Sequence, residues 1–245
     1  MSFLSRFEQF FIKVKQNRWI WLFSIFCRVT LAFGFIMAGF VKIIDERFAS
    51  GLSIIHPMGS YLNALHQTGY YYTFIGIVQI IAAVFLLIPR FVFLGALLYF
   101  PIILNIFILS YAVRFEGSLL TSPLMLLANI FLLCWHYDRL KFLLPIKDPQ
   151  PVILPKPIKY SNKFPFKFVL GSAAAVAVIV AGVVLMSTQA VMPENSISDC
   201  VGRYEDTNRT TAAAEFCDCV HNKGLPLDTC LENYENAPDD VEANN

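Results

Sequence analysis

Five apolar segments, each close to the length of helix that crosses a lipid bilayer, constrain this chain more than any other feature. A bilayer core of about 30 Å needs roughly 20 apolar residues of helix. The segments are residues 19–44, 71–88, 91–111, 119–135 and 166–186. The first is too long for a signal peptide, and no small-x-small cleavage site follows it, so we expect it to remain as a span. The sequence predicts an all-α integral membrane protein.

Composition agrees with a membrane protein and excludes other classes. Of the 245 residues, 56% are hydrophobic and 15% are charged, and the mean hydropathy is +0.57. Ordinary globular and disordered chains do not have this balance. The 19 Lys and Arg against 18 Asp and Glu give a net charge of +1. This leaves no overall basic excess for binding nucleic acid.

The charges are sorted along the chain, and this predicts an orientation. Residues 1–18 carry four cations against one anion, residues 136–168 carry seven against two, and residues 187–245 carry three against twelve. Arg90 lies between the second and third spans. By the positive-inside rule, the N-terminus is cytoplasmic and the C-terminus extracytoplasmic. We therefore predict a multi-pass protein of the plasma membrane, which in bacteria is the inner membrane.

Residues 1–18 are predicted to form an amphipathic helix on the inner leaflet. Apolar residues recur there at helical spacing, opposite Arg6, Lys13 and Lys15. They are Phe3, Leu4, Phe7, Phe10, Phe11 and Val14. The alternative is a basic leader without fixed structure.

A proline-rich segment separates the fifth span from the others. Residues 19–140 form the predicted four-span bundle, and residues 141–165 form a stiff cytoplasmic linker with six prolines. The fifth span, residues 166–186, carries a small-residue stripe that would let another helix approach closely. The stripe consists of Ala173, Ala177 and Ala181. The alternative is a plain membrane tether.

The acidic tail, residues 187–236, contains four cysteines, which in an oxidising compartment predict two disulfides. They are Cys200, Cys217, Cys219 and Cys230. A Cys217–Cys219 bridge would be strained, so the outer two cysteines each pair with one of the central two. Both connectivities remain open. A redox-active dithiol and a zinc site that includes His221 are alternatives to structural bridges.

Two helices are predicted within the tail. Thr210 or Thr211 is expected to cap the first, which stops at Gly224, and the second starts near Pro226 or Leu227. The result is a small helical hairpin that depends on its disulfides for stability. Residues 237–245 are predicted to be a disordered acidic end.

Polar side chains inside the spans are costly and are therefore candidate ligand-binding residues. Arg28, Gln79 and Asn129 lie at a similar depth, and Asn105 lies closer to the outer face, after Pro101. One interpretation is a pocket for an anionic or carbonyl-bearing ligand, such as a quinone headgroup or a lipid. The other is that Arg28 extends to the lipid headgroups while the three amides join helices by hydrogen bonds.

A second group of polar residues is predicted at the outer mouth of the bundle. His56, His66, Arg114 and Glu116 lie in the loops on that side. The two histidines have no acidic neighbours at ligand spacing, so we predict no metal site there. We also predict no catalytic residue, because the sequence shows no arrangement of nucleophile and base or of paired carboxylates.

Residues 19–140 resemble DoxX-type membrane proteins. The resemblance is carried by the pattern Arg28-x5-Gly34-x4-Gly39-x2-Lys42, by His56-Pro57 in the outer loop, and by GIVQIIAAVFLLIPR, which ends the second span at Arg90. It implies a four-helix membrane bundle, related in architecture to vitamin K epoxide reductase and often associated with redox or sulfur metabolism. The thiol-oxidising relatives carry a Cys-x-x-Cys motif in the bundle, and this chain has none.

The leading functional hypothesis is a non-enzymatic membrane subunit that anchors or stabilises a cell-envelope complex. Its partners would be other membrane or extracytoplasmic subunits, contacted in part through the acidic tail. The alternative is a quinone-binding redox subunit in which Arg28 polarises a carbonyl group. A third hypothesis is a carrier of lipid or a small solute.

Overall fold

All five predicted spans are helices in the computed structural model, which describes residues 3–143, 160–205 and 207–240. Every regular element of the described residues is helical. Five helices are long and apolar enough to cross a membrane. They are α2 (Arg18–Ile43), α4 (Tyr70–Leu87), α5 (Val92–Ala112), α7 (Thr121–Trp135) with the short α6 (Glu116–Leu119) before it, and α9 (Phe166–Gln189). Their limits agree with the predicted ones to within a few residues.

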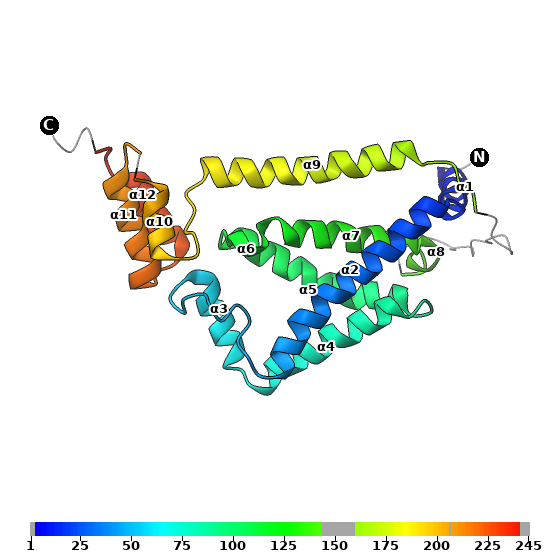
Figure 1. Cartoon of the computed structure of the whole chain (residues 1–245), viewed down its shortest axis with the longest axis horizontal. Helices are drawn as coiled ribbons and strands as arrows, with labels where there is room; N and C mark the ends of the chain where they lie inside the picture. The colour runs from blue at the N-terminus through cyan, green and yellow to red at the C-terminus, as the bar shows by residue number, and fades with distance from the viewer. Residues whose placement is uncertain (1–2, 144–159, 206, 241–245) are drawn as a thin grey trace.

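Helices α2, α4, α5 and α7 form a closed bundle, in which α2 contacts both α4 and α7 and α5 lies between α4 and α7 (Figure 1). The most extensive contact joins α2 to α4. A Cβ atom added at Gly39 would lie 2.8 Å from the carbonyl oxygen of Gly76. Only glycine allows two helix backbones to approach this closely.

The bundle core is apolar and aromatic, with the rings of Phe35 and Tyr99 stacked at a centroid distance of 3.5 Å. Large apolar side chains also cover the outside, among them Phe26, Phe33 and Phe40 of α2. An apolar surface around an apolar core is compatible with a multi-pass membrane protein.

Helix α9 runs alongside α7 but contacts the bundle sparsely (Figure 1). Near its start, the ring of Phe168 lies 5.4 Å from that of Phe23 and 5.7 Å from that of Phe131. None of its residues is fully buried. The predicted small-residue stripe, Ala173, Ala177 and Ala181, is exposed. It therefore faces away from the bundle.

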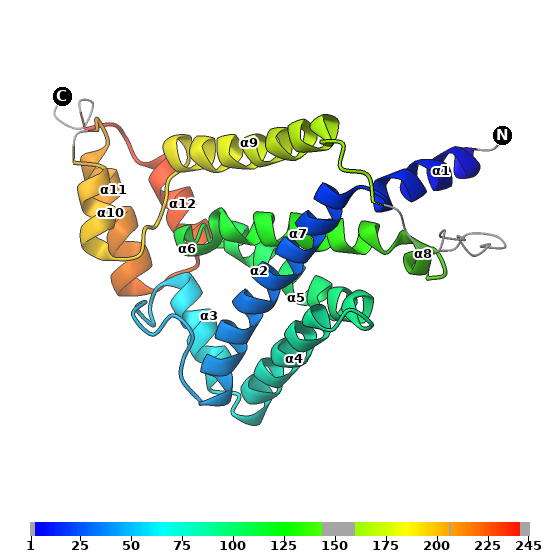
Figure 2. The same cartoon turned by 45° about the vertical axis from the view of Figure 1, so that its right-hand side comes forward.

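At one end of the bundle, α1 (Phe3–Lys15) lies beside α8 (Tyr137–Leu140) (Figures 1 and 2). Glu8 pairs with Lys141 at 2.8 Å, and Lys15 pairs with Asp138 at 3.3 Å. Burial lowers the pKa of Lys15. Lys15, predicted opposite the apolar face of this helix, is largely buried and points toward α8.

The end of the linker is anchored at the joint between α1 and α2. Asn17 and Ser161 form an isolated β-bridge, and the side-chain amide of Asn17 donates to the carbonyl oxygen of Lys163 at 2.8 Å. Most of the proline-rich linker lies outside the described residues. We call this end of the molecule the basic end.

The tail folds into a small helical domain at the other end. It contains α10 (Ile197–Arg203), α11 (Thr210–Asp218), a π-helical turn η1 (Cys219–Lys223) and α12 (Leu227–Asn236). Disulfides join Cys200 to Cys217 and Cys219 to Cys230. The predicted pairs of outer and central cysteines are confirmed, and the structure selects one of the two connectivities.

The two predicted tail helices are present, and Gly224 ends the first with a left-handed φ of 62°. Two details differ from the prediction. The domain has a further helix, α10, so it is more than a hairpin. No hydroxyl caps α11. Instead, its Thr211 N–H lies 3.3 Å from the carboxylate of Asp240, and Arg209 pairs with Asp239 at 2.9 Å. Residues 237–240 are thus held against α11, whereas the rest of the predicted disordered end, residues 241–245, lies outside the described residues.

Candidate functional site

The structure does not bring the four predicted ligand-binding residues together. Arg28 lies at the end of α4, where its Nε donates to the carbonyl oxygen of Leu86 at 2.7 Å and Nη2 donates to that of Leu87 at 2.9 Å. The last carbonyls of a helix lack partners within the helix and carry its negative dipole end, so a guanidinium group is well suited to cap them. Asn105 is exposed on the outside of α5.

Gln79 and Asn129 lie inside the bundle, 2% and 0% exposed. The side-chain amide of Asn129 donates to the carbonyl oxygen of Ala96 at 3.2 Å and so joins α7 to α5. The hydroxyl group of Tyr99, one turn further along α5, is also buried. Sequence reasoning missed Tyr99, because a tyrosine in an apolar segment gives no sign of whether it faces the core. All three polar side chains are buried inside the bundle, whereas Arg28 caps the end of α4.

The outer-mouth residues behave differently, because three of the four lie where the tail domain meets the bundle. His56 starts α3 (Pro57–His66), and its Nδ1 accepts a hydrogen bond from the Met58 N–H at 3.1 Å. His66, at the far end of α3, contacts the Asp45 carbonyl oxygen at 3.0 Å and does not belong to this region. We call the contact region the junction. It comprises His56, Arg114, Glu116, Glu194, Arg203 and His221.

Two histidines, one from each region, lie side by side in the junction. The ring centroids of His56 and His221 are 5.6 Å apart, and the two residues are 0% and 6% exposed. His221 Nε2 donates to the carbonyl oxygen of Pro193 at 2.6 Å. Since Nδ1 of His56 accepts a hydrogen bond, the proton of its neutral ring is assigned to Nε2.

Burial lowers the pKa of His56 to about 4, and the neighbouring His221 contributes to this decrease. His56 is therefore neutral at neutral pH. A charged ring could not accept the Met58 N–H, so the neutral form is the one that this packing stabilises.

Charged side chains complete the junction. Arg114 donates to the carbonyl oxygen of Val191, and Arg203 of α10 pairs with Glu194 and donates to the Ser187 carbonyl oxygen. The same guanidinium group lies 4.0 Å from the carboxylate of Glu116. These contacts link the loop after α5 and the start of α6 to the end of α9 and to α10.

Two junction residues adopt the left-handed backbone conformation without being glycine. They are Arg114, with a φ of 51°, and Glu194, with a φ of 53°. This conformation costs roughly 1–2 kcal/mol for a residue with a side chain. Arg114 donates across the junction to Val191, and Glu194 pairs with Arg203 within the tail, and these contacts offset the cost.

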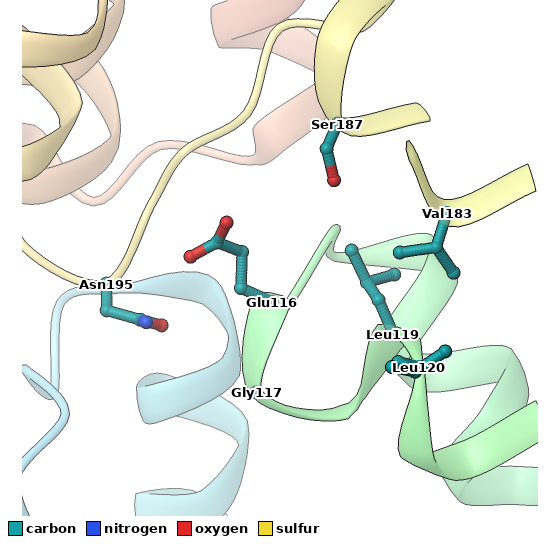
Figure 3. Close-up of a pocket in the computed structure, with 7 residues that line it drawn as sticks. All are labelled: Glu116, Gly117, Leu119, Leu120, Val183, Ser187 and Asn195. Carbon is teal, nitrogen blue, oxygen red and sulfur yellow. The ribbon is translucent and has the colours of Figure 1, made fainter. Parts of the chain in front are cut away.

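A pocket of about 390 Å³ opens beside the junction, between α6 and the end of α9. Glu116, Ser187 and Asn195 supply polar groups on one side, and Leu119, Leu120 and Val183 line the other (Figure 3). The arrangement has no nucleophile paired with a base. The described residues also contain no group of three or more His, Cys, Asp or Glu side chains placed to hold a metal ion.

A single sequence gave little sign of the tail half of this site. Four of its residues lie far along the chain from the loops that they meet: Ser187, Glu194, Arg203 and His221. The proline-rich linker also indicated separate domains. Before α11 the charged residues of the tail are acidic except for Arg203 and Arg209, and this composition does not mark which of them meet the bundle.

One known protein is similar to this chain over a large part of its own length. The chain is 36% identical over 121 residues to the uncharacterized protein YwoB of Bacillus subtilis (strain 168), and the match covers 47% of this chain and 77% of YwoB. The chain belongs to the same family as YwoB. No family model matches it, and no solved structure matches it. The DoxX-like resemblance therefore stays a prediction.

Proposed function

We propose that this member of the YwoB family is a multi-pass membrane subunit whose tail domain binds a partner outside the cytoplasm. Two features support the membrane placement. The five long helices are apolar on their outer faces, and the cations gather at the basic end while the acidic tail and its disulfides lie at the other. Under the positive-inside rule, the basic end is cytoplasmic.

The main support for the proposal is the surface that the tail domain exposes when it is docked on the bundle. Asp228, Glu232 and Glu235 are all exposed and follow one another at helical spacing along α12. Among the ion pairs of the described residues, these three carboxylates take no part. A row of unpaired carboxylates on a rigid domain suits a partner with a basic surface.

A groove of about 560 Å³ lies between α11 and α12, on the opposite face of α12 from the acidic row. Phe216, Leu225 and Tyr234 contribute its apolar lining, and Asn233 contributes an amide. The groove and the acidic row therefore lie on different faces of the tail domain, and we infer that the acidic row forms the partner-binding face.

The enzymatic alternative has less support. A quinone-binding redox subunit, as we predicted it, uses Arg28 to polarise a carbonyl group, and the guanidinium group of Arg28 already donates to Leu86 and Leu87. The carrier hypothesis would need a path through the bundle, whose interior is filled by the core around Phe35 and Tyr99.

The proposal is tested by crosslinking the full chain in its native membrane and identifying the attached proteins by mass spectrometry. Replacing Asp228, Glu232 and Glu235 together by Lys should abolish the crosslinks to an extracytoplasmic partner. The matched control is Glu46→Lys, which reverses an exposed charge on the bundle at the same end of the molecule and should leave them intact. Equal crosslinking by both variants would contradict the proposal.

A further inference from the structure

We propose that the pocket between α6 and α9 binds the headgroup of an aminophospholipid, with the primary ammonium group on the carboxylate of Glu116. The proposal rests on the membrane placement given above but not on the partner-binding face. The pocket lies at the outer end of the long helices, where a bilayer places the headgroups of its outer leaflet.

The walls of the pocket divide into a polar and an apolar side, as the headgroup region of a lipid does. Glu116 offers a carboxylate, Ser187 a hydroxyl and Asn195 an amide, and the three lie around one space (Figure 3). Leu119, Leu120 and Val183 lie opposite. The hydroxyl and amide can donate to a phosphodiester while the carboxylate accepts from an ammonium group.

The carboxylates of Glu194 and Asp199 add negative charge around Glu116 and so favour a cationic ligand group. The nearest guanidinium group, that of Arg203, lies 4.0 Å away and is already committed to Glu194 and to the Ser187 carbonyl oxygen. The Glu116 side chain is 38% exposed, so a ligand can reach it. A primary ammonium group adds both a positive charge and hydrogen-bond donors, whereas a trimethylammonium group has no N–H and a phosphoglycerol headgroup has no cation.

The size and position of the pocket fit a headgroup. Its volume of about 390 Å³ lies toward the small end of ligand pockets, which span roughly 300–1,000 Å³. The acyl chains would stay in the bilayer beside α9, which has no fully buried residue and touches the bundle mainly near its start. The site is therefore open to lipid from the side.

The test uses the full chain in nanodiscs of defined lipid, followed by native mass spectrometry of the lipids that remain bound. With equal amounts of phosphatidylethanolamine, phosphatidylcholine and phosphatidylglycerol, wild-type protein should retain phosphatidylethanolamine preferentially. Glu116→Gln should reduce that preference about tenfold, because it removes a charge-assisted hydrogen bond. The matched control, Glu232→Gln, changes an exposed carboxylate of α12 and should have no effect.

A second variant separates loss of the site from loss of folding. Val183→Trp fills the pocket from α9 and leaves Glu116 in place, so it should also remove the preference while circular dichroism and the disulfides stay unchanged. Equal retention of the three lipids by wild-type protein would overturn the proposal. A Glu116→Gln variant that keeps the preference would also overturn it. If Glu116→Gln instead lost a crosslinked protein partner, the group bound in the pocket would be a protein side chain, and the proposal would again be wrong.

Discussion

The four-helix bundle and the tail domain hold their helices together by different means. In the bundle, backbones meet at Gly39 and Gly76, and the rings of Phe35 and Tyr99 stack between the helices. In the tail, one disulfide joins α10 to α11 and another joins η1 to α12. A domain of about 50 residues cannot bury enough apolar surface to be stable on its own. The stability of the bundle therefore depends on close packing between its helices, and that of the tail depends on disulfides, which form in an oxidising environment.

The largest expected effect comes from removing a disulfide. Replacing Cys200 and Cys217 together by Ser opens a loop with a sequence separation of 17, and in the chain-entropy model such a bridge contributes about 3 kcal/mol. We expect the tail to unfold while the bundle stays helical. Hydrogen exchange would show loss of protection in residues 197–236, with protection retained in α2 and α4.

The control for this experiment is Cys134→Ser, which removes an exposed cysteine that forms no disulfide. It should leave exchange in both regions unchanged. A tail that stays protected without its Cys200–Cys217 bridge would show that docking at the junction, and not the covalent bond, keeps it folded.

The second prediction tests the bundle side of the comparison. In a Gly76→Ala variant, the new Cβ would lie 2.7 Å from the Gly39 carbonyl oxygen and 2.8 Å from Lys42 Cβ. The helices must separate to admit it, and we expect the free energy of unfolding to fall by about 1–3 kcal/mol. Tryptophan fluorescence during titration with dodecyl sulfate would measure the change.

Gly171→Ala is the matched control, because nothing lies within 4 Å of the added Cβ on α9. Alanine has the higher helix propensity, so this variant should be neutral or slightly more stable. If both glycine variants behaved alike, close packing of α2 on α4 would not be what stabilises the bundle.

The long helices could be predicted from the sequence, because length and hydropathy are local properties of each segment. Which face of a helix meets its neighbours was harder to predict. In α9 both faces are apolar, and small residues on one face, such as Ala177, do not reveal whether a partner helix is present in the same chain. The guanidinium group of Arg28 caps the carbonyls at the end of α4, and a single sequence does not show which helix end such a side chain reaches.

The candidate site was predicted in part. His56, Arg114 and Glu116 were identified as an outer group because topology placed their loops on the same side. Their partners in the tail were missed, since contacts such as that between His56 and His221 depend on how two separate regions dock. A single sequence contains no direct sign of such docking.

The smallest expected effect concerns the junction, where the two regions meet. The pKa of His56 is about 4 in the docked structure, against about 6.5 for a free histidine. The undocked state therefore binds protons more strongly, and docking weakens as the pH falls from about 6.5 toward 4. At pH 5.5 we expect the docking equilibrium to shift by about tenfold, or roughly 1.4 kcal/mol.

Spin labels are placed at Ser60 of α3 and Thr229 of α12, which are both exposed. Double electron–electron resonance then measures the distance between the labels from pH 7.5 to 4.5. The population at longer distance should grow as the pH falls. His56→Gln should remove most of this pH dependence, because the Gln side-chain oxygen can accept the Met58 N–H and does not titrate. His66→Gln is the control, since His66 lies beside Asp45 away from the tail, and it should keep the response. A response that persists in His56→Gln and disappears in His66→Gln would place the sensitive group outside the junction.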